Sequence, residues 1–82
     1  MKNFLLITSD TTGVLARITS IVSAVGVNIA AVSAFPSGKE GTAVVHLRLY
    51  ADAIESERIR RRLSKLVDVR AVYNGTEPVN AA

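Results

Sequence analysis

Apolar positions recur along the chain with two different periods, and the changes of period divide it into six segments. Residues 2–9 are apolar on both faces, which predicts a central strand, and residues 27–35 predict a second strand. Residues 42–50 and 67–73 alternate between apolar and polar positions, which predicts two more strands with one face buried.

The alternation also assigns side chains to faces. In the third strand it places Val45, Leu47 and Leu49 on one face and His46, Arg48 and Tyr50 on the other. In the last strand it places Val67, Val69 and Ala71 together, opposite Asp68, Arg70 and Val72.

A helical period separates the first and second strands. Residues 14–25 predict a helix whose apolar stripe consists of Val14, Ile18, Ile21, Val22 and Val25. Thr11 or Thr12 is suited to cap its beginning, and Gly26 follows its last residue, where a left-handed glycine ends many helices.

A second helical period follows the third strand. Asp52 begins it as the N-cap and Glu55 stands three residues later, the spacing of a capping box. Its buried edge is predicted to contain Ile59, Leu63 and Leu66. The order is therefore βαββαβ. Two right-handed βαβ halves of this kind form the ferredoxin-like fold, a four-stranded antiparallel sheet with both helices on one face.

Composition adds an expectation about assembly. The chain has 82 residues, and 49% of them are hydrophobic. This length is enough for one domain. Its mean hydropathy of +0.30 leaves apolar side chains on the surface of so small a domain, which favours a homodimer or larger assembly. The chain has no cysteine, no signal peptide and no apolar stretch of membrane-spanning length, so we expect a cytoplasmic protein.

Charge distribution bears on nucleic-acid binding. The net charge is only +3, but Arg58, Arg60, Arg61 and Arg62 lie within five residues of the second helix. The fold order is shared with RNA-binding RRM domains, which stack bases on aromatic side chains of the central strands. Here the third strand offers only His46 and Tyr50 for stacking. We therefore interpret the arginine run as a solvated helix face that Glu55 and Glu57 partly neutralise.

Residues for catalysis and metal binding are few. His46 is the single histidine, and no serine elbow, paired carboxylates or phosphate-binding loop accompany it. Without cysteine or clustered acids, metal ligands are also too few. We predict a protein that is not an enzyme and that has no metal or cofactor.

One loop suggests a ligand. Residues Asp10, Thr11, Thr12 and Gly13 connect the first strand to the first helix. The backbone N–H groups at a helix N-terminus attract a carboxylate, and Asp10 can accept hydrogen bonds from an ammonium group. Asn28 begins the next strand and offers both a donor and an acceptor. Such a mixed set suits a zwitterion, although Asp-x-x-Gly is also simply a good turn.

These same residues resemble the ACT domain. The resemblance covers about residues 2–74 and rests on D-T-T-G-V-L-A-R-I (10–18) and G-V-N-I (26–29). It implies a βαββαβ fold, dimers with a joined sheet, and amino-acid effectors bound at the interface. Residues 1–75 would then form the domain and residues 76–82 a flexible tail. The effector residues that it implies are Asp10, Thr11, Thr12, Gly13, Val14, Asn28, Ile29 and Ala30.

A second stretch narrows the resemblance. L-S-K-L-V-D-V-R-A-V (63–72), together with Arg17, is similar to small regulatory subunits of acetolactate synthase, some of which have one ACT domain. The resemblance implies allosteric regulation in branched-chain amino-acid biosynthesis, with an effector such as valine or leucine. Two differences stand out. Asp10 replaces an asparagine that many such subunits have, and Ala30 and Ala31 stand where an acid often follows the N-I pair. Stand-alone ACT proteins and the ACT domains of stringent-response enzymes share much of the pattern.

Three functions stay open at this point. The first is an amino-acid-binding regulatory subunit of a biosynthetic enzyme. The second is a ligand-free module that docks onto a catalytic partner through the sheet or through the helix of residues 58–65. The third is an RNA-binding module that uses the same helix.

Overall fold

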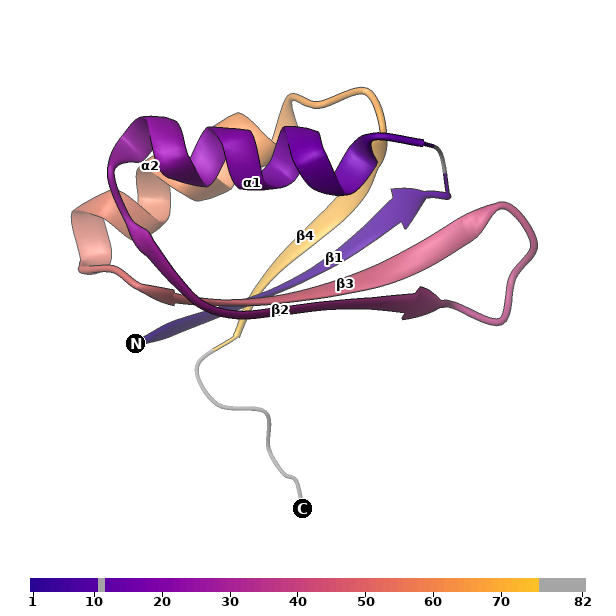
Figure 1. Ribbon diagram of the computed structural model, residues 1–82, viewed down its shortest axis with the longest axis horizontal. Coiled ribbons are helices and arrows are strands. Elements are labelled where there is room, and N and C mark those ends of the chain that lie inside the picture. Colours follow the sequence, from indigo (N-terminus) through magenta and orange to yellow (C-terminus); the bar gives the residue numbers. More distant parts are fainter. Residues whose placement is uncertain (11, 76–82) are drawn as a thin grey trace, which may run out of the picture.

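The computed structural model describes residues 1–10 and 12–75, which form the predicted βαββαβ order. Residues 76–82, where the sequence predicts a flexible tail, lie outside the described residues. The elements are β1 (Lys2–Ser9), α1 (Val14–Val25), β2 (Asn28–Pro36), β3 (Thr42–Tyr50), α2 (Ala53–Ser64) and β4 (Val69–Gly75). Figure 1 shows two layers, with both helices on the same face of the sheet.

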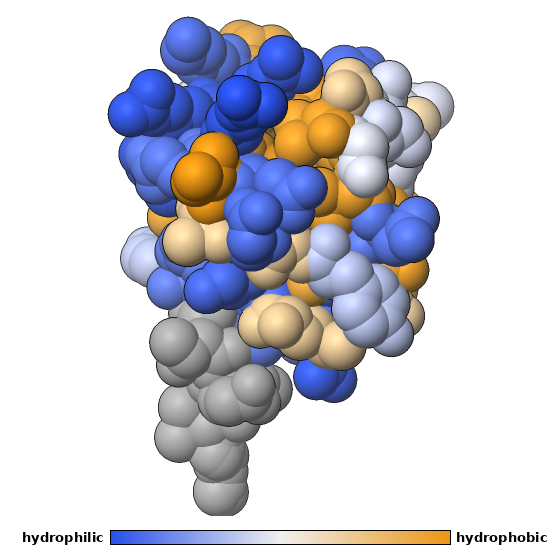
Figure 2. Space-filling model, turned by 90° about the vertical axis from the view of Figure 1, so that its left-hand side faces the viewer, coloured by the Kyte–Doolittle hydropathy of each residue, from blue (hydrophilic) through white to orange (hydrophobic). Residues whose placement is uncertain are grey.

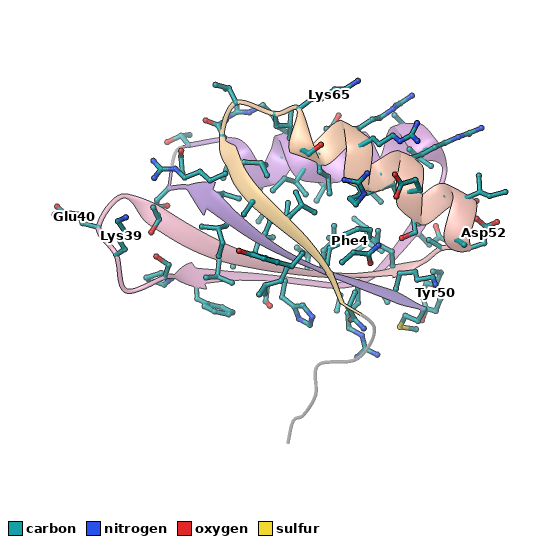
Figure 3. All side chains as sticks on the ribbon, turned by 180° about the vertical axis from the view of Figure 1, so that it is seen from behind. Phe4, Lys39, Glu40, Tyr50, Asp52 and Lys65 are labelled. Atoms are coloured by element: carbon teal, nitrogen blue, oxygen red, sulfur yellow. The ribbon has the colours of Figure 1, made fainter. Side chains whose placement is uncertain are left out.

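The four strands form one antiparallel sheet in the order β2-β3-β1-β4. The ferredoxin-like fold is therefore confirmed, and so is the central position of β1. Phe4, Leu6 and Thr8 of β1 pair with Leu47, Val45 and Ala43 of β3, and all six are buried beneath the helices. Figure 3 shows Phe4 between the sheet and α2.

Helix α1 ends as predicted and begins differently. Gly26 adopts φ 89°, its N–H donates to the Ser23 carbonyl (2.9 Å), and the Val27 N–H donates to the Val22 carbonyl (3.4 Å). This is a Schellman motif, and Val22 and Val27 both belong to the apolar core beside it. The predicted threonine cap is wrong for Thr12, because the N-cap residue is Gly13. Thr11 lies outside the described residues.

Helix α2 begins with the predicted capping box. The Glu55 N–H donates to Asp52 Oδ1 (2.8 Å), and the Asp52 N–H donates to Glu55 Oε1 (3.0 Å). Ile59 and Leu63 are fully buried. Leu66 lies beyond the end of the helix and is only partly buried against the same core. Glu55 therefore does not neutralise the arginines. That part of the prediction is wrong, because its carboxylate is bound to the helix backbone.

Strand β4 begins two residues later than predicted, and its faces differ from the prediction. Val67 is 93% exposed in the turn before the strand. Val69 pairs with Thr8, whereas Ala71 pairs with Ile7, because a bulge interrupts the register between them. The bulge inserts one residue and reverses the alternation. As a result, Val69 and Val72 face the core, and Ala71 faces the other way.

Strand β2 is an edge strand with little cover. Every residue from Ala30 to Pro36 is exposed, on both faces, and only Ile29 packs against the core. A second irregularity in the pairing with β3 lies between Ile29 and Ala31. The helix-free face of the sheet carries apolar residues too, with Leu5 39%, Phe35 51% and Tyr73 57% exposed. The structure thus leaves apolar side chains uncovered, as the composition predicted.

Candidate effector site

The loop from Asp10 to Gly13 is fixed to two other parts of the molecule at its start. The Ser9 N–H donates to the Asp68 carbonyl (2.7 Å), in the turn between α2 and β4. The Asp10 N–H donates to the Gly41 carbonyl (3.0 Å), in the loop between β2 and β3. The Asp10 carboxylate is exposed. The chain that leads into α1 is therefore held against both of these turns.

Gly13 begins α1 without a side-chain cap of its own. It adopts φ 86° and has no side chain to hydrogen-bond to the first turn, whose first backbone bond joins the Arg17 N–H to the Gly13 carbonyl (3.0 Å). The N–H groups of Val14, Leu15 and Ala16 precede that bond, and the N-cap residue supplies them with no side-chain acceptor. The Val14 side chain is buried in the core, so it can offer a ligand only its backbone.

An ion pair lies beside this glycine. Arg17 donates from Nη2 to Asp68 Oδ2, and a Cβ atom added to Gly13 would lie 3.2 Å from Arg17 Nη1. The carboxylate of Asp68 is mostly buried, with 15% of its side chain exposed, against 47% for Arg17. The Arg17 guanidinium therefore lies close to the start of α1, with its charge balanced by the Asp68 carboxylate.

A surface hollow opens next to Asp10, and sequence reasoning did not identify most of its lining. It has a volume of about 190 Å³ and is lined by Asp10, Ala34, Phe35, Pro36 and Ala43. Apart from Asp10, these residues come from the end of β2 and the start of β3. Antiparallel pairing of Pro36 with Ala43, and of Ser9 with Thr42, brings them to the end of β1. In the sequence, the proline and two glycines between residues 36 and 41 indicate only a turn.

Asn28 lies far from this loop along the sheet. It pairs with Tyr50, whereas Ser9 pairs with Thr42. Eight residues of β3 separate the two positions, which is about 26 Å at about 3.3 Å per residue. Figure 1 shows the start of β2 and the start of α1 at opposite ends of the molecule. One chain therefore brings together Asp10, Thr12, Gly13 and Val14, but it keeps Asn28, Ile29 and Ala30 apart from them.

Other chemistry is sparse among the described residues. No group of three or more metal-ligating side chains occurs there, and no helix is long and apolar enough to cross a membrane. His46 is half-buried on the helix-free face, where its cross-strand neighbours Leu5 and Ser33 are not ionisable. The exposed aromatic residues of the sheet are Phe35 and Tyr73 on the edge strands and Tyr50 at the end of β3. They do not form the central stacking platform of an RRM.

Solved structures similar to this one define the class of the fold. The ACT domain from the GTP pyrophosphokinase of Chlorobium tepidum superposes with a TM-score of 0.74 at 19% identity, covering 89% of this chain and 94% of that one. The small subunit of acetolactate synthase from Thermotoga maritima gives 0.82 at 20% identity, covering 96% of this chain but 48% of that one. The C-terminal domain of the MgtC protein from Mycobacterium tuberculosis gives 0.72 at 18% identity, covering 98% and 92%.

This chain therefore has the fold of an ACT domain, and a glycine loop leads into its first helix. A family model narrows the assignment. The AHAS small subunit-like ACT domain matches residues 4–71, and the chain belongs to this family. A comparison with curated protein sequences finds no match. ACT domains are regulatory modules rather than catalytic ones, which agrees with the few catalytic residues that the sequence offers.

Proposed function

We propose that this chain is an amino-acid-binding regulatory domain that forms a homodimer in the cytoplasm and controls a biosynthetic enzyme of the acetolactate synthase type. The observation that carries the proposal is the juxtaposition at the start of α1. Uncapped backbone N–H groups can receive a carboxylate, the exposed Asp10 carboxylate can receive an ammonium, and the apolar hollow can receive a small side chain. A free aliphatic amino acid such as valine or leucine has these three parts.

The size of the hollow favours a site completed by a second copy. The hollow of one chain has about 190 Å³, whereas ligand pockets usually enclose about 300–1,000 Å³. Strand β2 borders the hollow and leaves its outer edge unpaired in the four-stranded sheet. Unpaired edges favour pairing with another strand, and two-fold symmetry makes such pairing between identical strands antiparallel.

Such pairing would also explain Asn28. If two copies of β2 pair about a two-fold axis at Val32, the midpoint of Asn28–Pro36, then residue 28 of one copy aligns with residue 36 of the other. Asn28 of a second copy would then lie beside Pro36, at the Asp10 hollow. This arrangement unites the residues that a single chain keeps apart. It supports a proposed site containing Asp10, Thr11, Thr12, Gly13 and Val14 of one copy and Asn28, Ile29 and Ala30 of the other.

The test is the thermal stability of the purified chain in millimolar concentrations of each of the twenty amino acids. We expect a branched aliphatic amino acid to stabilise it, by about 2.7 kcal/mol at 100 times the Kd. Asn28→Ala should abolish this stabilisation while the variant still folds, because the Asn28 side chain is not part of the core of the single chain. Asn74→Ala is the matched control, since Asn74 is an exposed asparagine on the other edge strand.

The result also decides between functions. If no amino acid stabilises the chain, the free-standing sensor is excluded. Co-purification with a large thiamine-diphosphate enzyme would then support a ligand-free docking module. We expect no binding to RNA, because the aromatic residues are dispersed, and a salt-dependent mobility shift with RNA would contradict this.

A further inference from the structure

We propose that the outer face of α2 docks an acidic segment of a partner protein, one of whose aliphatic side chains occupies a hollow at the start of the helix. The inference rests on the proposed function, which supplies the partner: the catalytic subunit that this domain regulates. It concerns a surface that neither the effector site nor the paired β2 strands use.

The outer face of α2 is a basic stripe that consists of Ile54, Arg58, Arg61, Arg62 and Lys65. These residues are spaced mostly three or four apart, so they lie on one side of the helix, away from Ile59 and Leu63 in the core. All five are exposed. Figure 2 shows hydrophilic residues gathered over the side of the molecule that carries α2, and in Figure 3 Lys65 points away from the sheet.

Most of this positive charge has no internal partner. Glu57 accepts hydrogen bonds from Arg60 (2.6 and 3.0 Å) and from Arg61 Nε (3.1 Å), and Glu55 is bound to the helix backbone. No ion pair of the described residues involves Arg58, Arg62 or Lys65. Three exposed cations along about 11 Å of helix, at about 1.5 Å per residue, favour a partner that carries carboxylates.

The stripe also has an apolar anchor point. A hollow of about 370 Å³ is lined by Ala53, Ile54, Glu57, Arg58 and Arg61. The Ile54 side chain at its edge is 71% exposed. It gives this charged helix face one large aliphatic side chain. An apolar point surrounded by arginines is the composition of a protein-protein hot spot, where a buried aliphatic contact is enclosed by polar groups.

The same details favour a protein over a nucleic acid. Helix α2 contains no aromatic residue on which a base could stack, and the Glu57 carboxylate in the hollow would repel a phosphate. The location is favourable too. Helix α2 packs against α1 and β4, whereas β2 forms the other edge of the sheet. Docking on the basic stripe is therefore compatible with dimer formation through β2.

The experiment measures binding of the full chain to the purified catalytic subunit from the same organism by isothermal titration, at two salt concentrations. The double variant Arg58→Glu/Arg62→Glu should lower the affinity by more than about tenfold, and Ile54→Ser should lower it by about tenfold. Higher salt should weaken binding of the unaltered chain and should have much less effect on the double variant. Lys39→Glu/Arg70→Glu is the control, because it changes the net charge equally at exposed positions on other elements. Circular dichroism checks that each variant is folded.

The outcomes separate this inference from the proposed function. If the unaltered chain and the double variant bind the catalytic subunit equally, the docking surface is overturned while the proposed function stands. If the unaltered chain does not bind that subunit, the proposed partner fails. The surface is then tested with a synthetic peptide of alternating glutamate and leucine. Binding that the double variant loses supports the basic stripe, and no binding, or binding only to polyuridylate RNA, overturns it.

Discussion

The two helices of this domain begin in opposite ways. Helix α2 begins at Asp52, whose side chain and that of Glu55 satisfy two backbone N–H groups between them. Helix α1 begins at Gly13, which has no side chain and holds a left-handed backbone conformation, φ 86°. The same small sheet therefore supports one helix start that is closed by its own residues and one that is open to an anion.

The difference suggests that the two starts have different purposes. A capping box stabilises a helix by roughly 1 kcal/mol or more, and α1 does without one. It begins instead beside an apolar hollow, an exposed carboxylate and an arginine. A helix start that gives up local stabilisation in such surroundings is expected where a ligand supplies the missing hydrogen bonds.

The largest expected effect comes from replacing the glycine at the start of α1. Gly13→Ala should destabilise the chain by about 1–2 kcal/mol, because an L residue is strained in the left-handed region. It should also weaken stabilisation by the amino acid, since an added Cβ would lie 3.2 Å from Arg17 Nη1 and crowd the backbone at the start of α1. Thermal denaturation with and without ligand measures both effects, and about 4–8 °C is expected for each kcal/mol in a domain of this size.

Gly38→Ala is the matched control for that variant. Gly38 has φ +91°, but a Cβ there would meet nothing within 4 Å. It should therefore show a similar loss of stability and keep its response to the amino acid. If Gly13→Ala also keeps that response, the start of α1 does not bind the ligand, and the comparison between the helices has no functional meaning.

The next effect comes from opening the closed start. Asp52→Ala removes the cap of α2 and should lower the free energy of unfolding by about 1 kcal/mol. Asp52→Asn should retain most of that stability, because asparagine also caps helices well. Denaturant titration measures the loss. Neither variant should alter the stabilisation by the amino acid. If both variants alter it, the two helix starts are not independent.

The smallest effect concerns the charges of α2. Hydrogen bonds from Arg60, with a further contribution from Arg61, lower the pKa of Glu57 from its ordinary value of 4.5 to about 2. Since the folded pKa lies below the unfolded one, the pair contributes stability above the ordinary pKa and loses it as the pH falls through the folded pKa. A carboxyl NMR titration should show this low midpoint, and in Arg60→Gln the midpoint should rise. An unchanged midpoint would mean that Arg60 is not the main cause.

Sequence reasoning predicted the fold well because the signals were local. The stripe of α1, the capping box at Asp52 and the glycine stop at Gly26 each depend on residues within a few positions of one another. The start of β4 was missed because Val67 and Val69 follow a regular alternation in sequence. Only the pairing with β1 shows that the strand begins at Val69, after the turn that contains Val67, and that a bulge between Val69 and Ala71 breaks the alternation.

The site was less predictable because it depends on distant parts of the chain. Sequence identified Asp10 and Gly13 from their turn, but Phe35 reaches Asp10 only through the register of β2 on β3 and β3 on β1. Asn28 follows α1 closely in sequence, yet it lies a full helix length from Gly13. The residues near Asn28 in sequence do not reveal this separation. Because of it, the proposed role of Asn28 depends on a second copy.

The central position of β1 has a consequence for how the chain is made. Both of its neighbours, β3 and β4, are synthesised after it, and β4 is the last element of the described chain. A nascent chain that has not yet reached Val69 leaves one whole side of its first strand without a partner. Folding of this sheet on the ribosome is therefore expected to finish only once Gly75 has emerged, so β1 waits for β4.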